Sequence, residues 1–254
     1  MFILKMQSIK TLKWMMYAGL LFFSQQAIAD QIKAIPWVKM NTETAQVTHI
    51  YQALKISCTN NAEVWKKKTI KDNRLYIIDK TPQLIEFVKE NNQYVMLNSW
   101  NFKHYQHHSK SPMDEVLSSD GIRIYPAFYP LNRQKFAIAV VKRWSVSYSG
   151  GGRLEEIADF VMLEPNGVYK LALADTPFHS YERIRACFSQ EEYENSTDCH
   201  DESSSNLSIE FKNIGKTYYQ WILNYNDLSW EAFQPETSKL VEKYHNNVML
   251  FARK

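Results

Sequence analysis

The chain has 254 residues, of which 22% are charged, and it carries a formal net charge of +3. Three lysines and no acidic residue lie in the first 29 positions, so the other 225 residues hold 27 basic and 27 acidic side chains. A neutral chain lacks the surplus of Lys and Arg that nucleic-acid phosphates attract. The composition therefore argues against a nucleic-acid-binding protein, and the length suits one domain with a substantial core.

Residues 1–29 have the pattern of a secretory signal peptide. A basic start with three lysines precedes an apolar segment at 14–23, which is too short to span a bilayer. An Ala-Ile-Ala sequence at 27–29 matches the small-residue cleavage site of exported proteins. We predict cleavage before Asp30 and export of a chain with no later transmembrane segment, with an uncleaved membrane anchor as the alternative.

Residues 30–121 are predicted to form an N-terminal α/β portion. Apolar residues at i, i+3, i+4 and i+7 predict one helix from about 42 to 55. Thr81 followed by Pro82 has the N-cap and N1 pattern of a second helix, which we expect to reach Glu90. Two short strands are expected at 75–78 and 94–97.

The segment after these strands contains a histidine cluster made of His104, His107 and His108. Spacings of three and four residues occur in some metal sites, because such residues share a helix face. The segment has no H-E-x-x-H motif and no cysteine partner, and its Ser and Pro residues are typical of a loop. We predict a polar surface loop and no cofactor, and we keep the three histidines as weak candidates for metal ligands.

Residues 122–254 are predicted to form an antiparallel β-meander with a C-terminal helix at 236–250. The run at 135–148 is apolar at consecutive positions, which is typical of a central strand that is covered on both faces. Three glycines at 150–152 and the Asn166-Gly167 pair predict hairpin turns. The other strands are expected at 122–128, 157–163, 168–173, 181–188, 207–211 and 217–225.

These elements together predict an α+β fold, in which N-terminal helices and short strands pack on the antiparallel meander. The N-terminal portion and the meander are expected to share one compact domain.

All three cysteines follow the signal sequence. Export favours disulfide formation, and Cys187 and Cys199 are close enough in sequence to close a short loop. We predict that this bond forms and stabilises the fold by about 2–3 kcal/mol. Cys58 is then expected to be a free, buried side chain.

The interval between Arg185 and Lys212 contains no Lys or Arg. Its acidic side chains indicate either a solubilising surface loop or a negative patch that docks a basic partner and steers its approach. The candidate partner-binding residues are Glu191, Glu192, Glu194, Asp198, Asp201 and Glu202.

The chain lacks the common catalytic signatures, including G-x-S-x-G, C-x-x-C and G-x-G-x-x-G. We therefore predict a non-enzymatic binding protein with no catalytic residue. Two alternatives stay open. One is a hydrolase acting on envelope material, and the other is a periplasmic metal or ligand carrier that uses His104, His107 and His108.

The strings RWSVSYSGGGRLEEIADFVML and RACFSQEEYENSTDCHDES resemble uncharacterised exported β-rich proteins of Gram-negative bacteria. Some of those proteins are similar to periplasmic immunity proteins encoded beside type VI secretion effectors. The resemblance covers about residues 142–203. It implies a periplasmic protein that binds a toxic effector enzyme and blocks its active site.

Overall fold

The computed structural model describes residues 31–57, 62–68, 72–109, 116–196 and 198–251. The predicted signal peptide and Cys58 lie outside these ranges. Ile32 to Lys254 form one compact unit. Strand accounts for 58% of the structure and helix for 9%, so the fold is β-rich and the predicted α+β class is wrong in its helical half. In the part of the chain that the structure describes, no helix has the length and apolarity to cross a membrane.

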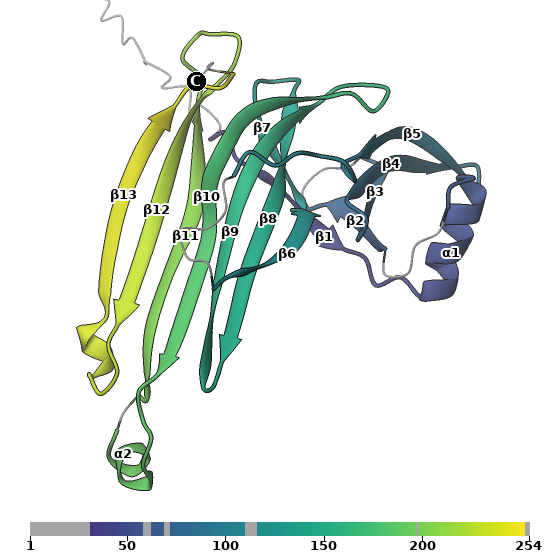
Figure 1. The fold of residues 1–254 in the computed structure, drawn as a ribbon. Helices are drawn as coiled ribbons and strands as arrows, with labels where there is room; N and C mark the ends of the chain where they lie inside the picture. The colour runs from purple at the N-terminus through teal and green to yellow at the C-terminus, as the bar shows by residue number, and fades with distance from the viewer. Residues whose placement is uncertain (1–30, 58–61, 69–71, 110–115, 197, 252–254) are drawn as a thin grey trace, which may run out of the picture. The chain divides into compact units, whose positions relative to one another are not determined.

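Within the described residues, thirteen strands form one antiparallel sheet in the order β13-β12-β11-β10-β9-β8-β7-β1-β2-β3-β4-β5, with β6 also paired to β8 (Figure 1). The strands are β1 (Ile35–Lys39), β2 (Glu63–Lys67), β3 (Arg74–Asp79), β4 (Gln83–Glu90), β5 (Gln93–Asn101), β6 (Ser118–Ile124), β7 (Ala127–Pro130), β8 (Phe136–Tyr148), β9 (Gly151–Leu163), β10 (Tyr169–Arg185), β11 (His200–Lys212), β12 (Gln220–Trp230) and β13 (Leu240–Val248).

The first predicted helix is confirmed as α1 (Thr44–Ala53), which buries Val47, Ile50 and Tyr51. The second predicted helix, at 81–90, is wrong, because this segment forms strand β4. Its apolar residues fit a strand that is covered on both faces: Leu84 enters one core cluster, and Ile85 and Phe87 enter another.

The two asparagines after β4 do not end a helix. Asn91 and Asn92 have φ values of 48° and 62°, so they form the tight turn that connects β4 to β5. Short apolar runs fit helix and strand patterns equally well, and pairing of this segment with β5 in a hairpin selected the strand.

The predicted meander is confirmed from β8 to β12, and β8 is central as expected. The two strands predicted at 168–173 and 181–188 are wrong as separate elements, because β10 runs through both and takes up the irregularity as shifts of register with β9. Ala137 and Ala139 are buried in a cluster on one face of the sheet, and Ile138 and Val140 are buried on the other. The predicted turn after β9 is also confirmed, because Asn166 and Gly167 have φ values of 61° and 76°. The N-terminal strand β1 lies between β7 and β2 and joins the long strands to the short ones.

The predicted C-terminal helix at 236–250 is wrong. A single 3-10 turn, η1 (Glu236–Ser238), precedes the edge strand β13. The apolar residues Leu240, Tyr244 and Val248 recur every four positions, and an even spacing also places them on one face of a strand. Pairing with β12 stacks Tyr244 on Tyr225, with 4.9 Å between the ring centroids.

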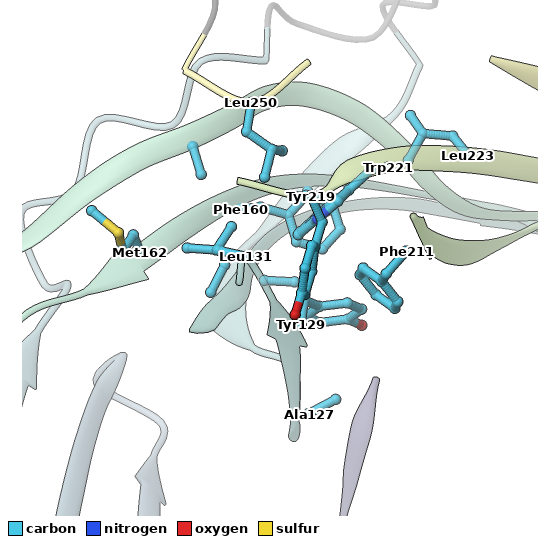
Figure 2. Close-up of a cluster of buried hydrophobic side chains, with 14 of the residues drawn as sticks. Ala127, Tyr129, Leu131, Phe160, Met162, Phe211, Tyr219, Trp221, Leu223 and Leu250 are labelled. Atoms are coloured by element: carbon cyan, nitrogen blue, oxygen red, sulfur yellow. The ribbon is translucent and has the colours of Figure 1, made fainter. Parts of the chain in front are cut away.

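The largest core cluster lies on one face of the long strands (Figure 2). The indole of Trp221 meets the ring of Phe160 edge-on at 5.0 Å and the ring of Phe211 at 5.4 Å. Its Nε1–H donates to the carbonyl of Pro130 at 3.1 Å. This cluster ties β12 to β7 and β9, which are distant in the sequence.

Candidate functional site

The predicted acidic loop is a structured tip between β10 and β11, seen at the end of that hairpin in Figure 1. Cys187 and Cys199 have their sulfur atoms 2.07 Å apart, so the predicted disulfide pairing is confirmed. Between them lies the short helix α2 (Gln190–Asn195). We call residues 185–199 the disulfide tip.

The backbone of the disulfide tip is fixed by a capping box. Ser189 Oγ accepts from the N–H of Glu192, and the carboxylate of Glu192 accepts from the N–H groups of Ser189 and Phe188 at 2.8 and 2.7 Å. These backbone hydrogen bonds, led by that from Phe188, lower the pKa of Glu192 below its ordinary value. Glu192 is therefore committed to holding the fold of the tip.

Two aromatic side chains of the tip are exposed. The side chain of Phe188 is 75% exposed and that of Tyr193 is 45% exposed. The guanidinium of Arg185 lies 5.4 Å from the Phe188 ring and 5.5 Å from the Tyr193 ring, and its Nε donates to the carbonyl of Cys187 at 2.6 Å. The tip thus presents two exposed aromatic rings that are held against one guanidinium.

The turn between β8 and β9 helps to position Arg185. Gly150 has a φ of +81°, and a Cβ placed there would lie 2.4 Å from Cδ of Arg185. Gly121 has a similar φ of +89° but has no atom within 4 Å of such a Cβ. Alanine substitutions at these two glycines therefore separate the cost of backbone strain from the cost of a clash with the Arg185 side chain.

We expect Gly150→Ala to lower the free energy of unfolding by more than Gly121→Ala does. The positive φ costs each variant roughly 1–2 kcal/mol. Only Gly150→Ala must also displace the Arg185 side chain. Urea unfolding of both variants gives the comparison, and equal losses would show that Arg185 moves aside freely.

The six predicted partner-binding acids fall into two groups, one on α2 and one at and after Asp198. Glu191, Glu192 and Glu194 lie on α2, and the first and last of these are exposed. The side chain of Asp201 accepts from the N–H of Ala232 at 2.8 Å, and Glu202 lies 3.2 Å from Arg183. Asp198 lies 3.9 Å from His200. The fold therefore gives each acid of the second group a nearby partner, of which only Arg183 is a permanent cation, and the sequence interval alone did not reveal these partners.

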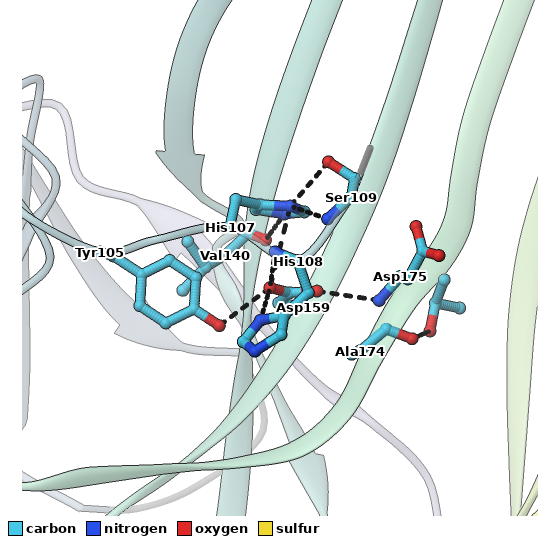
Figure 3. A network of polar contacts seen from close by, with 9 residues as sticks. Tyr105, His107, His108, Ser109, Val140, Asp159, Ala174 and Asp175 are labelled. Atoms are coloured by element: carbon cyan, nitrogen blue, oxygen red, sulfur yellow. Dashed lines mark hydrogen bonds and ion pairs between the residues drawn. The ribbon is translucent and has the colours of Figure 1, made fainter. Parts of the chain in front are cut away.

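The predicted histidine cluster is divided by the structure. His104 is exposed, whereas His107 and His108 lie beside the buried carboxylate of Asp159 on β9 (Figure 3). Asp159 Oδ2 accepts from the N–H of His108 and from its Nδ1, both at 2.8 Å, and from the hydroxyl of Tyr105 at 2.9 Å. The other oxygen accepts from the N–H of Asp175 at 2.8 Å.

The protonation of this network follows from its contacts. Burial by itself raises the pKa of Asp159. The hydrogen bonds from the backbone N–H groups of Asp175 and His108 and from the His108 ring lower this pKa by more than burial raises it, so the net shift is downward. Burial lowers the pKa of His107, whose Nε2 lies 3.0 Å from the carbonyl of Val140. His107 Nδ1 accepts from the N–H of Ser109, so the neutral ring carries its proton on Nε2.

These hydrogen bonds give His107 and His108 a structural role, which is to hold the loop against Asp159 and β8. Within the ranges that the structure describes, no group of three His, Cys, Asp or Glu residues is arranged to hold a metal ion. Asp114 and Glu115, downstream of the cluster, lie outside those ranges. Asp159 was missed by the sequence analysis because an isolated acid within an apolar strand carries no motif.

The sequence analysis also missed the aromatic part of the disulfide tip. Phe188 and Tyr193 lie within the interval that was chosen for its acids, and an aromatic residue next to a disulfide cysteine was the available signal. No family model, curated protein or solved structure matches this chain.

Proposed function

We propose that this chain is an exported, non-enzymatic binding protein that captures a basic protein partner with its disulfide tip. In the more specific form, it is a periplasmic immunity protein that inhibits a toxic effector enzyme of a type VI secretion system. The observation that carries the proposal is Phe188, an aromatic side chain that is 75% exposed and yet held in an ordered segment.

An ordered tip supports binding because little conformational entropy remains to be lost when the partner docks. The disulfide closes the base of the segment, and the Ser189–Glu192 capping box fixes its helix. The Arg185 guanidinium lies against both exposed rings. Aromatic side chains that fill a partner's pocket commonly dominate the affinity of an interface.

The charge of the tip supports a basic partner. Glu191 and Glu194 are exposed on α2 beside the two aromatic rings, while Arg185 is occupied by its contacts with those rings. Acidic side chains at the rim of an interface accelerate association with a cationic surface, and salt screens this effect. An aromatic centre with an acidic rim is the arrangement that such a partner requires.

The test has two steps: a search of the neighbouring genes for a secreted effector enzyme, and surface plasmon resonance of its association with this protein at low and physiological salt. The absence of an effector gene beside this one would count against the immunity role. We expect Glu191→Lys with Glu194→Lys to slow association by roughly tenfold or more at low salt and to flatten its salt dependence. Phe188→Ala is expected to speed dissociation roughly thirtyfold, the effect of losing about 2 kcal/mol at a hot spot.

Matched variants separate these effects from changes in net charge or stability. Glu43→Lys with Glu90→Lys makes the same change in charge on exposed residues outside the tip, and Val168→Ala truncates a side chain that is 51% exposed in the β9–β10 turn. Both controls should associate and dissociate as the unmodified protein does. Unchanged kinetics in the tip variants would place the interface on another surface of the protein.

A further inference from the structure

A cavity of about 600 Å³ opens on the sheet face that carries the Trp221 core. This volume is within the range of small-molecule sites, which is about 300–1,000 Å³. Phe178 and Leu207, from β10 and β11, are half-buried apolar side chains that pack against the core and line the cavity. The polar side chains Arg123, Tyr125, Tyr129 and Glu156 line it as well.

Tyr129 contributes a phenol hydroxyl to the cavity. The residue is 6% exposed, and its ring lies 4.8 Å from that of Phe160 and 6.1 Å from that of Trp221 (Figure 2). No described residue forms a hydrogen bond with its hydroxyl, although Tyr129 lines the cavity. Burial raises the pKa of this phenol, so it stays protonated and can donate. A hydroxyl that lines a cavity and makes no hydrogen bond within the protein is available to donate to a bound molecule.

The ion pair of Arg123 with Glu156, which also lines the cavity, leaves a second hydrogen-bond donor free. Arg123 donates from Nη2 to both oxygens of Glu156 at 2.9 Å and from Nε to one of them at 3.2 Å. Glu156 is 5% exposed, so its negative charge is covered by the guanidinium. Arg123 Nη1 has no acceptor among the described residues. The pair is neutral, and it offers N–H groups to a ligand without presenting a bare carboxylate.

We propose that this cavity binds a small molecule with an apolar body and a carboxylate head. The apolar body lies against Phe178 and Leu207, and the head accepts hydrogen bonds from the hydroxyl of Tyr129 and from Arg123 Nη1. Hydrogen bonds to a charged acceptor are stronger than those to a neutral one, so the donors select a carboxylate over an alcohol. This site is separate from the disulfide tip and does not depend on its role.

The experiment is isothermal titration calorimetry of the full mature chain with decanoate and with decanol. We expect decanoate to bind saturably with one site per chain and decanol to bind at least tenfold more weakly. Tyr129→Phe removes only the hydroxyl and should weaken decanoate binding about tenfold while leaving decanol unchanged. Ala34→Trp, which places a large side chain at the lining, should abolish binding of both probes.

Tyr219→Phe is the matched control. Tyr219 is also 6% exposed and belongs to the same core cluster, but it does not line this cavity. Its substitution should leave decanoate affinity unchanged, and thermal melts of each variant establish that it is folded. Equal affinity for decanoate in the unmodified protein and in Tyr129→Phe would overturn the assignment of the head group. No saturable binding of decanoate would overturn the site.

Discussion

Trp221→Ala is expected to lower the free energy of unfolding by about 3–5 kcal/mol, the cost of replacing a fully buried tryptophan by alanine. Trp221 is 0% exposed, and its indole packs edge-on against Phe160 and Phe211. The variant loses these contacts, leaves a cavity, and removes the donor that reaches the carbonyl of Pro130. Urea unfolding followed by circular dichroism measures the change.

Trp230→Ala is the control for this prediction. Trp230 is half-buried on the same strand, where its Nε1–H donates to the carbonyl of Gln234 and Lys239 lies 4.2 Å above its ring. Losing these surface contacts should cost about 1 kcal/mol. Similar losses for the two tryptophans would contradict the placement of the core on the face that Trp221 occupies.

Asp159→Asn is expected to lower the free energy of unfolding by about 3 kcal/mol, because a buried carboxylate with several donors loses its charge. Its two oxygens accept from Tyr105, His108 and the N–H of Asp175. An asparagine keeps one acceptor and turns an NH₂ group toward donors. Asp120→Asn changes an exposed pair with Arg143 and should cost less than about 1 kcal/mol.

The contribution of Asp159 to the free energy of unfolding depends on pH. The folded pKa of Asp159 lies below its ordinary value of 3.8, so its contribution to stability is fully present above about pH 4 and is lost as the pH falls through the folded pKa. The part of the difference in stability between the unmodified protein and Asp159→Asn that comes from this carboxyl group should therefore shrink below pH 4. A difference that grows as the pH falls below 4 would contradict the assignment.

His107 predicts a second loss of stability as the pH falls, in a pH range closer to neutrality than that of Asp159. Its folded pKa lies below the ordinary value of 6.5 because of burial. Between 6.5 and the lower folded value, the unfolded chain binds a proton that the folded chain does not, so stability decreases as the pH falls. Both proteins should show this decrease, and it should be larger in Asp159→Asn, because the charge of Asp159 raises the pKa of His107 in the unmodified protein.

The sequence by itself determined the features that depend on local chemistry. Two positive φ values at Asn166-Gly167 require a particular turn, and an apolar run such as 136–141 requires cover on both faces. Cys187 and Cys199 are near neighbours along the chain, so their pairing was also accessible. In each case the residues that decide the outcome lie within a few positions of one another.

Only the tertiary structure decided the elements whose pattern fits two periods. The segments 83–90 and 240–248 place apolar residues at spacings that suit either a helix or a strand, and pairing with β3 and β5, or with β12, selected the strand. The same holds for the sites. Asp159 and His108 are 51 positions apart, and Arg123 and Glu156 are 33 apart, so only the tertiary structure brings them together. Strand pairing is a long-range interaction, and a local pattern carries no information about its partner.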